Sequence, residues 1–295
     1  MTLRDDRHGR RSQGGHPAFT LVSSRWAGFL GGIVDGFWSL SLLVLVPALL
    51  VAMIAAHELA LRVHARLRPA ASDKADAAGS DEGFILSGVL GLLALLMGFS
   101  FSMALDRLED RRELMLKETS AVGYLAMLAE GLPPERAGPL QADLKAYAAA
   151  RLAAAEMADG TERRAAEERA AVLRAPLANK VRAAMRELPS GPLTVALAGA
   201  YDAVEDSAVR RQALAQAHLP ARVLWLLAVY ATISAAMLGY ALAAARARHR
   251  VASTTLYLLI ALAFGVILDL DRPRSGAITV DQAPFEEAVA GLSAG

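Results

Sequence analysis

An uncharged apolar run from Phe84 to Leu105 limits the folds open to this chain. A run of that length without a charged residue is typical of a membrane-spanning helix. It passes directly into the charged segment 106–113, and no proline lies between Phe84 and Leu132. Since nothing in this stretch forces a helix to end, the sequence predicts one helix that begins in lipid and continues in water towards Gly123.

Small residues mark one face of this predicted helix. They follow one another at steps of three or four: Ser87, Gly91, Ala94, Gly98 and Ser102. We call this set the small-residue stripe. Acidic side chains continue the stripe into the part of the helix predicted to lie in water: Asp106, Glu109 and Glu113. Small side chains let membrane helices approach closely, and they also leave room for a narrow pore. The sequence leaves both interpretations open, a helix-packing seam and a pore wall.

Three further apolar runs predict three more spans, at 37–56, 223–243 and 251–268. The composition agrees, because 55% of the residues are hydrophobic and the mean hydropathy is positive. No segment shows the alternation of apolar and polar residues that is typical of strands. We therefore predict an all-α membrane bundle of four transmembrane helices, with long helices that extend into a helical extramembrane domain.

Composition divides the chain into five predicted segments. A polar, partly disordered amino-terminal segment, 1–36, precedes the first transmembrane helix pair, 37–105. The helical extramembrane domain, 106–222, comes before a second transmembrane hairpin, 223–268. The last segment, 269–295, is a tail that opens with the sequence Asp-Leu-Asp-Arg-Pro.

A charged motif follows the last predicted span. Its charged members are Asp269, Asp271, Arg272, Arg274 and Asp281. The first two carboxylates lie at the carboxyl end of a helix, where the helix dipole disfavours negative charge, and charge near a membrane edge is costly unless it is paired. We therefore expect one of them to pair with an arginine, either within the motif or at Arg107 or Arg111. The second and fourth spans end on the same side of a four-span bundle, which makes the latter pairing possible. The motif can be structural, or it can form a polar vestibule or ion site.

Several function classes receive no support. The net charge of +1 gives no basic field for nucleic acid, and the absence of cysteine excludes thiolate chemistry. His57-Glu58 lacks the second histidine of a zinc-protease helix, since Leu61 stands there. No nucleophile, phosphate-binding glycine loop or metal constellation accompanies the two aspartates. We expect no catalytic residue, no cofactor and no metal, and hence no enzyme.

The closing motif also carries a resemblance. An apolar span that ends in Leu-Asp-Leu-Asp-Arg-Pro, followed by Arg, Gly and Val-Asp-Gln, resembles the bacterial bestrophin-like family of unknown function. The second span is similar to that family through three short stretches, at 98–102, 111–113 and 118–123. The likeness covers roughly residues 37–285, apart from the middle of the chain.

The resemblance implies a four-span, homo-oligomeric protein of the bacterial inner membrane, in contact with the lipid bilayer. The bestrophins for which the family is named are pentameric anion channels, so it further implies conduction of small anions. The alternative is a non-conducting membrane scaffold or sensor that binds a partner through its helical domain.

Loop charge predicts an orientation that differs from that of the bestrophins. The segments 62–68 and 246–250 are basic and lie on one side of a four-span bundle, which favours the cytoplasm for that side. The helical domain would then lie outside the cytoplasm. Bestrophins keep their large helical part in the cytoplasm, so the resemblance implies the opposite.

Overall fold

The computed structural model describes residues 41–67, 75–157, 160–217, 219–244, 249–272 and 276–294. It divides into the units Met1–Ser41 and Leu42–Gly295, and all that follows concerns the second. The amino-terminal segment predicted at 1–36 lies outside the described residues.

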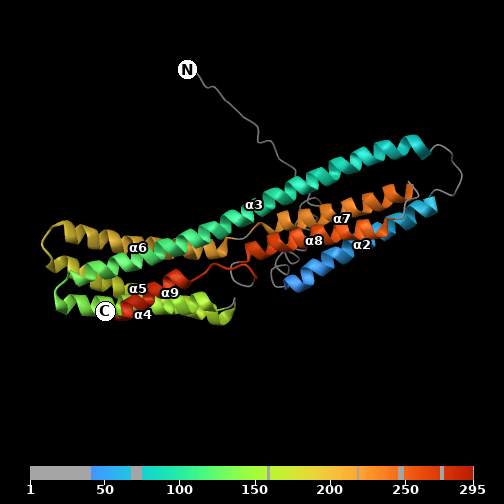
Figure 1. Ribbon diagram of the computed structural model, residues 1–295. Coiled ribbons are helices and arrows are strands. Elements are labelled where there is room, and N and C mark those ends of the chain that lie inside the picture. The colour runs from blue at the N-terminus through green and yellow to red at the C-terminus, as the bar shows by residue number, and fades with distance from the viewer. Residues whose placement is uncertain are drawn as a thin grey trace, which may run out of the picture. The chain divides into compact units, whose positions relative to one another are not determined.

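Helices make up the described part of the chain, which contains no strand (Figure 1). In chain order they are α2 (Leu42–Leu67), α3 (Ala75–Glu130), α4 (Pro134–Glu156), α5 (Thr161–Glu187), α6 (Pro192–Gln216), α7 (Ala221–Ala244), α8 (Arg250–Asp271) and α9 (Ala283–Ala294). The predicted all-α fold is confirmed.

Helix α3 is a single helix of 56 residues that runs without interruption past Leu105 and Asp106. At 1.5 Å per residue it is about 80 Å long, well beyond the roughly 30 Å of a bilayer's hydrocarbon core. It ends just before Pro133 and Pro134, where a prolyl ring cannot continue the hydrogen-bond ladder. The prediction of one unbroken helix across Leu105 and Asp106 is confirmed.

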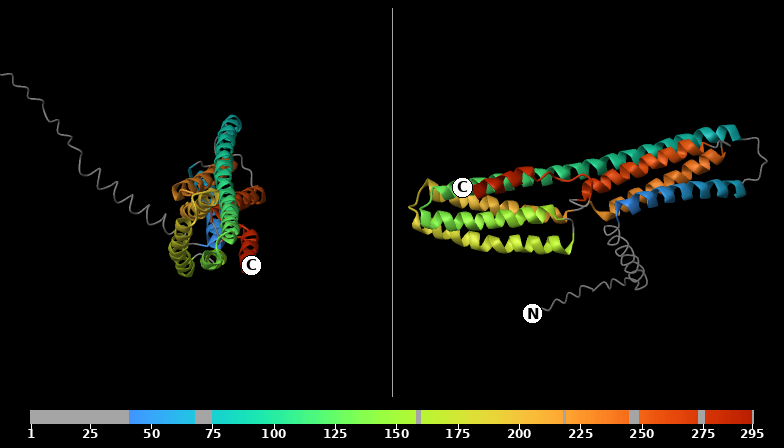
Figure 2. Two further views of the ribbon diagram at one scale, coloured as in Figure 1. Left: turned by 90° about the vertical axis from the view of Figure 1, so that its left-hand side faces the viewer. Right: turned by 60° about the horizontal axis from the view of Figure 1, so that its bottom comes forward.

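Four of the described helices are long and apolar enough to cross a membrane: α2, the part of α3 from Gly83, α7 and α8. Helix α2 packs against α7 and α8, and α3 packs against the same two helices (Figure 2). Helix α2 continues beyond the predicted end of the first span and reaches Leu67. The Tyr230 hydroxyl donates to the Val89 carbonyl at 3.2 Å and ties α7 to α3.

Glycines on α7 and α8 permit the close approach of α2. A Cβ atom added at Gly239 would lie 2.5 Å from the His57 carbonyl oxygen, and one at Gly265 would lie 2.8 Å from Val46 Cγ2. Beside this contact the Tyr257 hydroxyl lies 2.8 Å from His57 Nδ1. Small residues at a close helix crossing, joined by a polar contact, are a usual way to hold membrane helices together.

The second half of α3 belongs to a separate hydrophobic core. It packs with α4, α6 and α9, and α5 packs on α4 and α6 (Figures 1 and 2). The fully buried side chains at its centre include Val122, Leu125, Leu144, Val204 and Phe285. Because α3 supplies residues to this core and also packs on α7 and α8, it links the apolar spans to the extramembrane helices.

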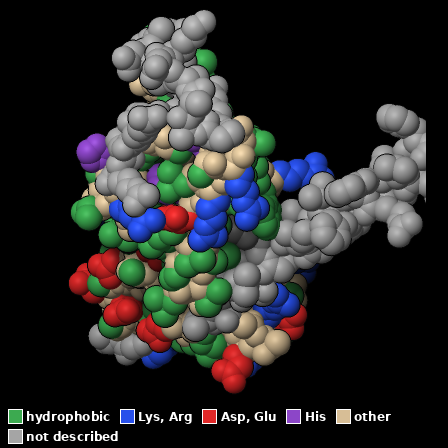
Figure 3. Space-filling model, turned by 90° about the vertical axis from the view of Figure 1, so that its right-hand side faces the viewer, with side chains coloured by type: hydrophobic (Ala, Val, Ile, Leu, Met, Phe, Trp, Pro, Cys, Tyr) green, Lys and Arg blue, Asp and Glu red, His purple; other side chains and the backbone are tan. Residues whose placement is uncertain are grey.

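The end of the molecule where α2 ends and α8 begins carries basic side chains beside hydrophobic ones (Figure 3). Arg62 and Arg66 are exposed in the last turns of α2, and Arg250 is exposed in the first turn of α8. This is the composition expected where membrane helices meet the lipid headgroups.

The contact at Gly239 generates a stability prediction. Gly239→Ala should lower the unfolding temperature of the purified protein, because the new methyl group displaces the His57 backbone, at a cost of roughly 1–3 kcal/mol. Gly88→Ala on α3 is the matched control, since a Cβ there meets nothing within 4 Å. Thermal unfolding in detergent measures both variants, and equal unfolding temperatures would contradict the close α2–α7 contact.

Candidate functional site

The small-residue stripe of α3 faces away from the rest of the protomer. All five of its residues are exposed, as are the three acidic residues that continue it: Ser87, Gly91, Ala94, Gly98, Ser102, Asp106, Glu109 and Glu113. A Cβ added at Gly91 or Gly98 would meet no atom within 4 Å. Different positions in this part of α3, such as Leu86 and Leu93, are buried. The stripe is therefore not a packing seam within the described part of one protomer.

Asp271 of the closing motif is the buried end of an ion pair. Its side chain has no exposed surface, and Arg107 on α3 donates from Nη1 to Oδ1 at 3.1 Å. The backbone N–H of Leu219, which lies just before α7, donates to both carboxylate oxygens at 2.9 and 3.1 Å. Arg107 is one of the partners that the sequence predicted, and the pair joins α3, α8 and the α6–α7 connection.

Arg111, one helical turn further along α3, caps the end of α8. It donates to the carbonyl oxygens of Leu270 at 3.2 Å and of Asp271 at 3.1 Å. The last carbonyls of a helix have no partner within that helix, and a cation is favoured beside them. Arg272 is also buried, and its backbone N–H donates to the Asp269 carbonyl at 3.2 Å.

Asp269 is satisfied by the backbone of the chain that follows α8. It accepts hydrogen bonds from the N–H groups of Ala277 at 2.8 Å and Ile278 at 2.9 Å. A Cβ at Gly276 would lie 2.5 Å from Asp269 Oδ1, so the chain passes close to this carboxylate only because that residue is glycine. Arg274, the remaining predicted arginine, lies outside the described residues.

Asp281 lies apart from the other carboxylates of the motif. It is exposed, and its Oδ1 accepts the N–H of Ala283, the first residue of α9, at 3.0 Å. A carboxylate here satisfies one of the N–H groups left free at a helix start. The closing motif thus combines a buried ion pair at Asp271, an Asp269 carboxylate bound by backbone N–H groups, and a cap for α9 at Asp281.

Another buried carboxylate, that of Glu118, lies on α3 beyond Arg107 and Arg111. It accepts hydrogen bonds from the Tyr147 hydroxyl at 3.0 Å and from Arg151 Nε at 3.0 Å. Arg211 Nε on α6 lies 3.2 Å from the same carboxylate oxygen as Arg151. We call these four residues the Glu118 cluster.

The environment of the Glu118 cluster favours a neutral Tyr147 hydroxyl and leaves Arg151 charged. Burial, and then the neighbouring Glu118 carboxylate, raise the pKa of Tyr147 well above its ordinary value, so its hydroxyl remains a donor. Burial lowers the pKa of Arg151, and the Glu118 carboxylate opposes that change. Because a guanidinium ordinarily titrates far above neutral pH, Arg151 stays charged.

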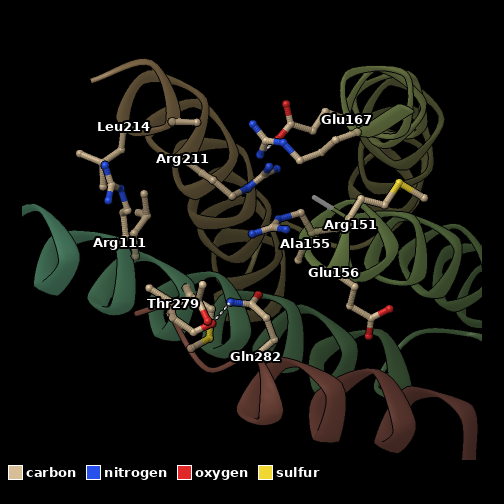
Figure 4. Close-up of a pocket in the computed structure, with 15 residues that line it drawn as sticks. Arg111, Arg151, Ala155, Glu156, Glu167, Arg211, Leu214, Thr279 and Gln282 are labelled. Atoms are coloured by element: carbon tan, nitrogen blue, oxygen red, sulfur yellow. Dashed lines mark hydrogen bonds and ion pairs between the residues drawn. The ribbon is translucent and has the colours of Figure 1, made fainter. Parts of the chain in front are cut away.

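A cavity of about 330 Å³ adjoins the Glu118 cluster. Arg151 and Arg211 extend towards each other in its middle, from α4 and α6, with Gln282 below them (Figure 4). Arg163 and Glu167 of α5 form an ion pair of 2.9 Å at its wall. The remaining lining residues are Arg111, Leu114, Met115, Ala155, Glu156, Met157, Leu214, Ala215, Thr279 and Val280.

The Glu118 cluster was not foreseen from the sequence. Glu118 belongs to a stretch that carries the family resemblance, but nothing marks Arg151 and Arg211 among the other basic residues of α4 and α6. The cavity brings together segments that carried the resemblance separately, since Arg111, Glu118 and Gln282 all lie in it or beside it. Only the helix packing reveals this.

Comparison with known proteins gives a family match over most of the chain. The family model described as a Bestrophin-like domain matches residues 40–285. No match was found among curated proteins.

Several solved structures share the fold. A Trp-to-Ala variant of a bacterial bestrophin homolog from Klebsiella pneumoniae matches with a TM-score of 0.63 at 15% identity, covering 86% of this chain and 97% of that one. A Pro-to-Ala variant of a protein described as a membrane protein gives 0.59 at 15% identity, covering 86% and 98%. An Ile-to-Thr variant of the Klebsiella pneumoniae homolog gives 0.59 at 15% identity, covering 84% and 96%. At identities this low, the structural likeness shows a common fold and nothing beyond the fold.

The Asp271 ion pair generates the second prediction. Asp271→Asn should lower the free energy of unfolding by roughly 3 kcal/mol, because it leaves Arg107 beside a neutral amide in a buried site. Asp281→Asn, the same change at the exposed cap, should cost less than about 1 kcal/mol. Chemical unfolding of the purified protein measures both, and equal losses would mean that the buried pair does not stabilise the junction.

Proposed function

Because this chain belongs to the Bestrophin-like family, we propose that it forms a homo-oligomeric ion channel in the bacterial inner membrane. The bestrophins for which the family is named are anion channels, so kinship implies small anions as the permeant ions. The bestrophins are channels rather than enzymes, so kinship supports a channel and no catalytic activity. The extramembrane helices, proposed at 106–222, would form the part of the assembly that projects into water.

The exposed stripe of α3 is the observation that carries this proposal. In the most apolar stretch of α3, 11% of the residues are buried within the protomer, against 33% in α8. Small side chains gain nothing from lipid that leucine would not gain better, whereas a close contact or a narrow water-filled axis requires them. The stripe therefore supports a position of α3 at the centre of an oligomer.

The acidic residues at the aqueous end of the stripe bear on ion selectivity. Asp106 and Glu109 are exposed on the continuation of the stripe, and a symmetric oligomer would repeat each of them around its axis. Rings of carboxylates attract cations and repel anions at a pore mouth. Kinship implies anions, whereas these carboxylates favour cations. Ion flux therefore has to be measured under a salt gradient that distinguishes anion flow from cation flow.

The third prediction concerns Gly98. In liposomes that contain the purified protein, Gly98→Leu should strongly reduce ion flux while the oligomer stays intact in size-exclusion chromatography, because the larger side chain occupies the axis. Gly88→Leu is the matched control, since Gly88 is equally open in the protomer but lies off the stripe. Its flux should remain close to that of the unmodified protein.

The outcomes separate the two interpretations of the stripe. Loss of the oligomer in Gly98→Leu would identify a packing seam between subunits rather than a pore wall. Absence of flux from a folded, oligomeric, unmodified protein would contradict the channel proposal and favour the scaffold or sensor.

We also propose the orientation that follows from loop charge. Arg62 and Arg66 are exposed at the end of α2, whereas Arg107 and Arg111 on the other side are engaged by Asp271 and by carbonyls of α8. Arg112 and Lys117 are also exposed on that other side, but they belong to a long segment, to which the rule for basic loops gives little weight. The short basic segments thus favour the cytoplasm for the end of α2. This orientation places the extramembrane helices outside the cytoplasm, and kinship with the bestrophins implies the reverse.

The fourth prediction tests this orientation. The chain contains no cysteine, so single substitutions can be labelled without background. A membrane-impermeant maleimide should label Ser190→Cys, an exposed position between α5 and α6, in intact spheroplasts, and it should not label Ala65→Cys on α2. The reverse pattern would establish the bestrophin-like orientation.

A further inference from the structure

We propose that the cavity beside the Glu118 cluster binds a small molecule that carries an oxyanion, a carboxylate or a phosphate group, through Arg151 and Arg211. The cavity is formed by the extramembrane part of α3, by α4, α5 and α6, and by the segment before α9. This inference goes beyond ion conduction, because it concerns a ligand site away from the apolar part of α3.

The charges of the Glu118 cluster do not balance. Arg151 donates from Nε to Oε2 of Glu118 at 3.0 Å, and Arg211 Nε lies 3.2 Å from the same oxygen in an ion pair without a hydrogen bond, so two guanidiniums share one carboxylate. Their side chains are only 4% and 19% exposed, and Glu118 is fully buried. A buried excess of positive charge is costly in a protein interior unless an anion compensates it.

The hydrogen-bonding groups of the two arginines are also largely unused. Each guanidinium has five N–H donors. Within the part of the chain that the structure describes, Arg151 donates one hydrogen bond, from Nε to Glu118, and Arg211 makes its one ion pair there as well. Both residues line the cavity, where their terminal amino groups remain available (Figure 4). Planar guanidinium groups match the oxygens of carboxylates and phosphates in a bidentate manner.

The remainder of the cavity indicates the size and character of the ligand. Its volume of about 330 Å³ is at the lower end of the range for small-molecule sites. Apolar side chains such as Leu114, Leu214 and Val280 line part of the wall. Buried Oε1 of Gln282 accepts no hydrogen bond from the described residues. These features fit a compact organic molecule with one acidic group, a short carbon skeleton and a donor for Gln282.

Calorimetric titration of the purified oligomer in a neutral detergent tests this site, with inorganic phosphate and succinate as probes. We expect saturable binding of at least one probe. Arg211→Gln should weaken it about tenfold or more, because a charge-assisted hydrogen bond is lost. Arg210→Gln is the matched control, since this neighbour is exposed and pairs with Asp206 at 2.8 Å. Its affinity should equal that of the unmodified protein.

A second variant separates binding from folding. Ala215→Leu places a larger side chain at the cavity wall and leaves both guanidiniums intact, so it should also abolish binding while the oligomer and its unfolding temperature are retained. Failure of the unmodified protein to bind either probe would overturn the proposal. Equal effects of Arg210→Gln and Arg211→Gln would overturn it as well.

A lipid headgroup offers the same phosphate chemistry as a free anion, and competition distinguishes the two sources. Displacement of inorganic phosphate by short-chain phosphatidylglycerol, but not by phosphatidylcholine, would identify an anionic lipid as the occupant of the site. Phosphate binding that both lipids leave unchanged would identify a soluble anion. The measurements require no ion conduction, so their result is independent of the channel proposal.

Discussion

The buried carboxylate of Asp271 holds the junction between the membrane helices and the extramembrane helices together. It receives Arg107 from α3 and the Leu219 N–H from the connection between α6 and α7, while Asp271 itself ends α8. Three segments that are distant in sequence therefore meet at one charged group. Such a group is costly to bury, and its cost is offset only while every partner stays in place. This requirement fixes the position of α8 along α3.

Helix α3 takes part in the packing on both sides of this junction. In the apolar part, α3 packs on α7 and α8 with Leu86 and Leu93 buried, and its small-residue face remains open. Away from the membrane, Val122 and Leu125 enter the core that α4, α6 and α9 complete. A continuous helix couples the two ends mechanically, since its hydrogen-bond ladder has no break at which one part could bend independently. A contact at either end therefore bears on the position of the stripe.

The buried carboxylates of Asp271 and Glu118 differ in their balance of charge. Arg107 pairs with Asp271, whose remaining lone pairs accept backbone N–H groups, as is usual for a structural ion pair. Glu118 instead faces two guanidiniums beside an open cavity. The same residue types thus form a closed junction in one place and an open, positively charged site in the other. That difference, rather than the presence of arginine, distinguishes the proposed ligand site.

The sequence by itself determined the helical class, the four spans and the continuity of α3, and it offered Arg107 as one of several arginines that could pair with Asp269 or Asp271. Each follows from a local rule: apolar length, the absence of proline, and the side on which antiparallel spans end. Only the tertiary structure decided that the stripe is open within the protomer and that Arg151 and Arg211 converge on Glu118. These depend on which helix faces pack against each other, and helical periodicity shows that a face exists without specifying its partner.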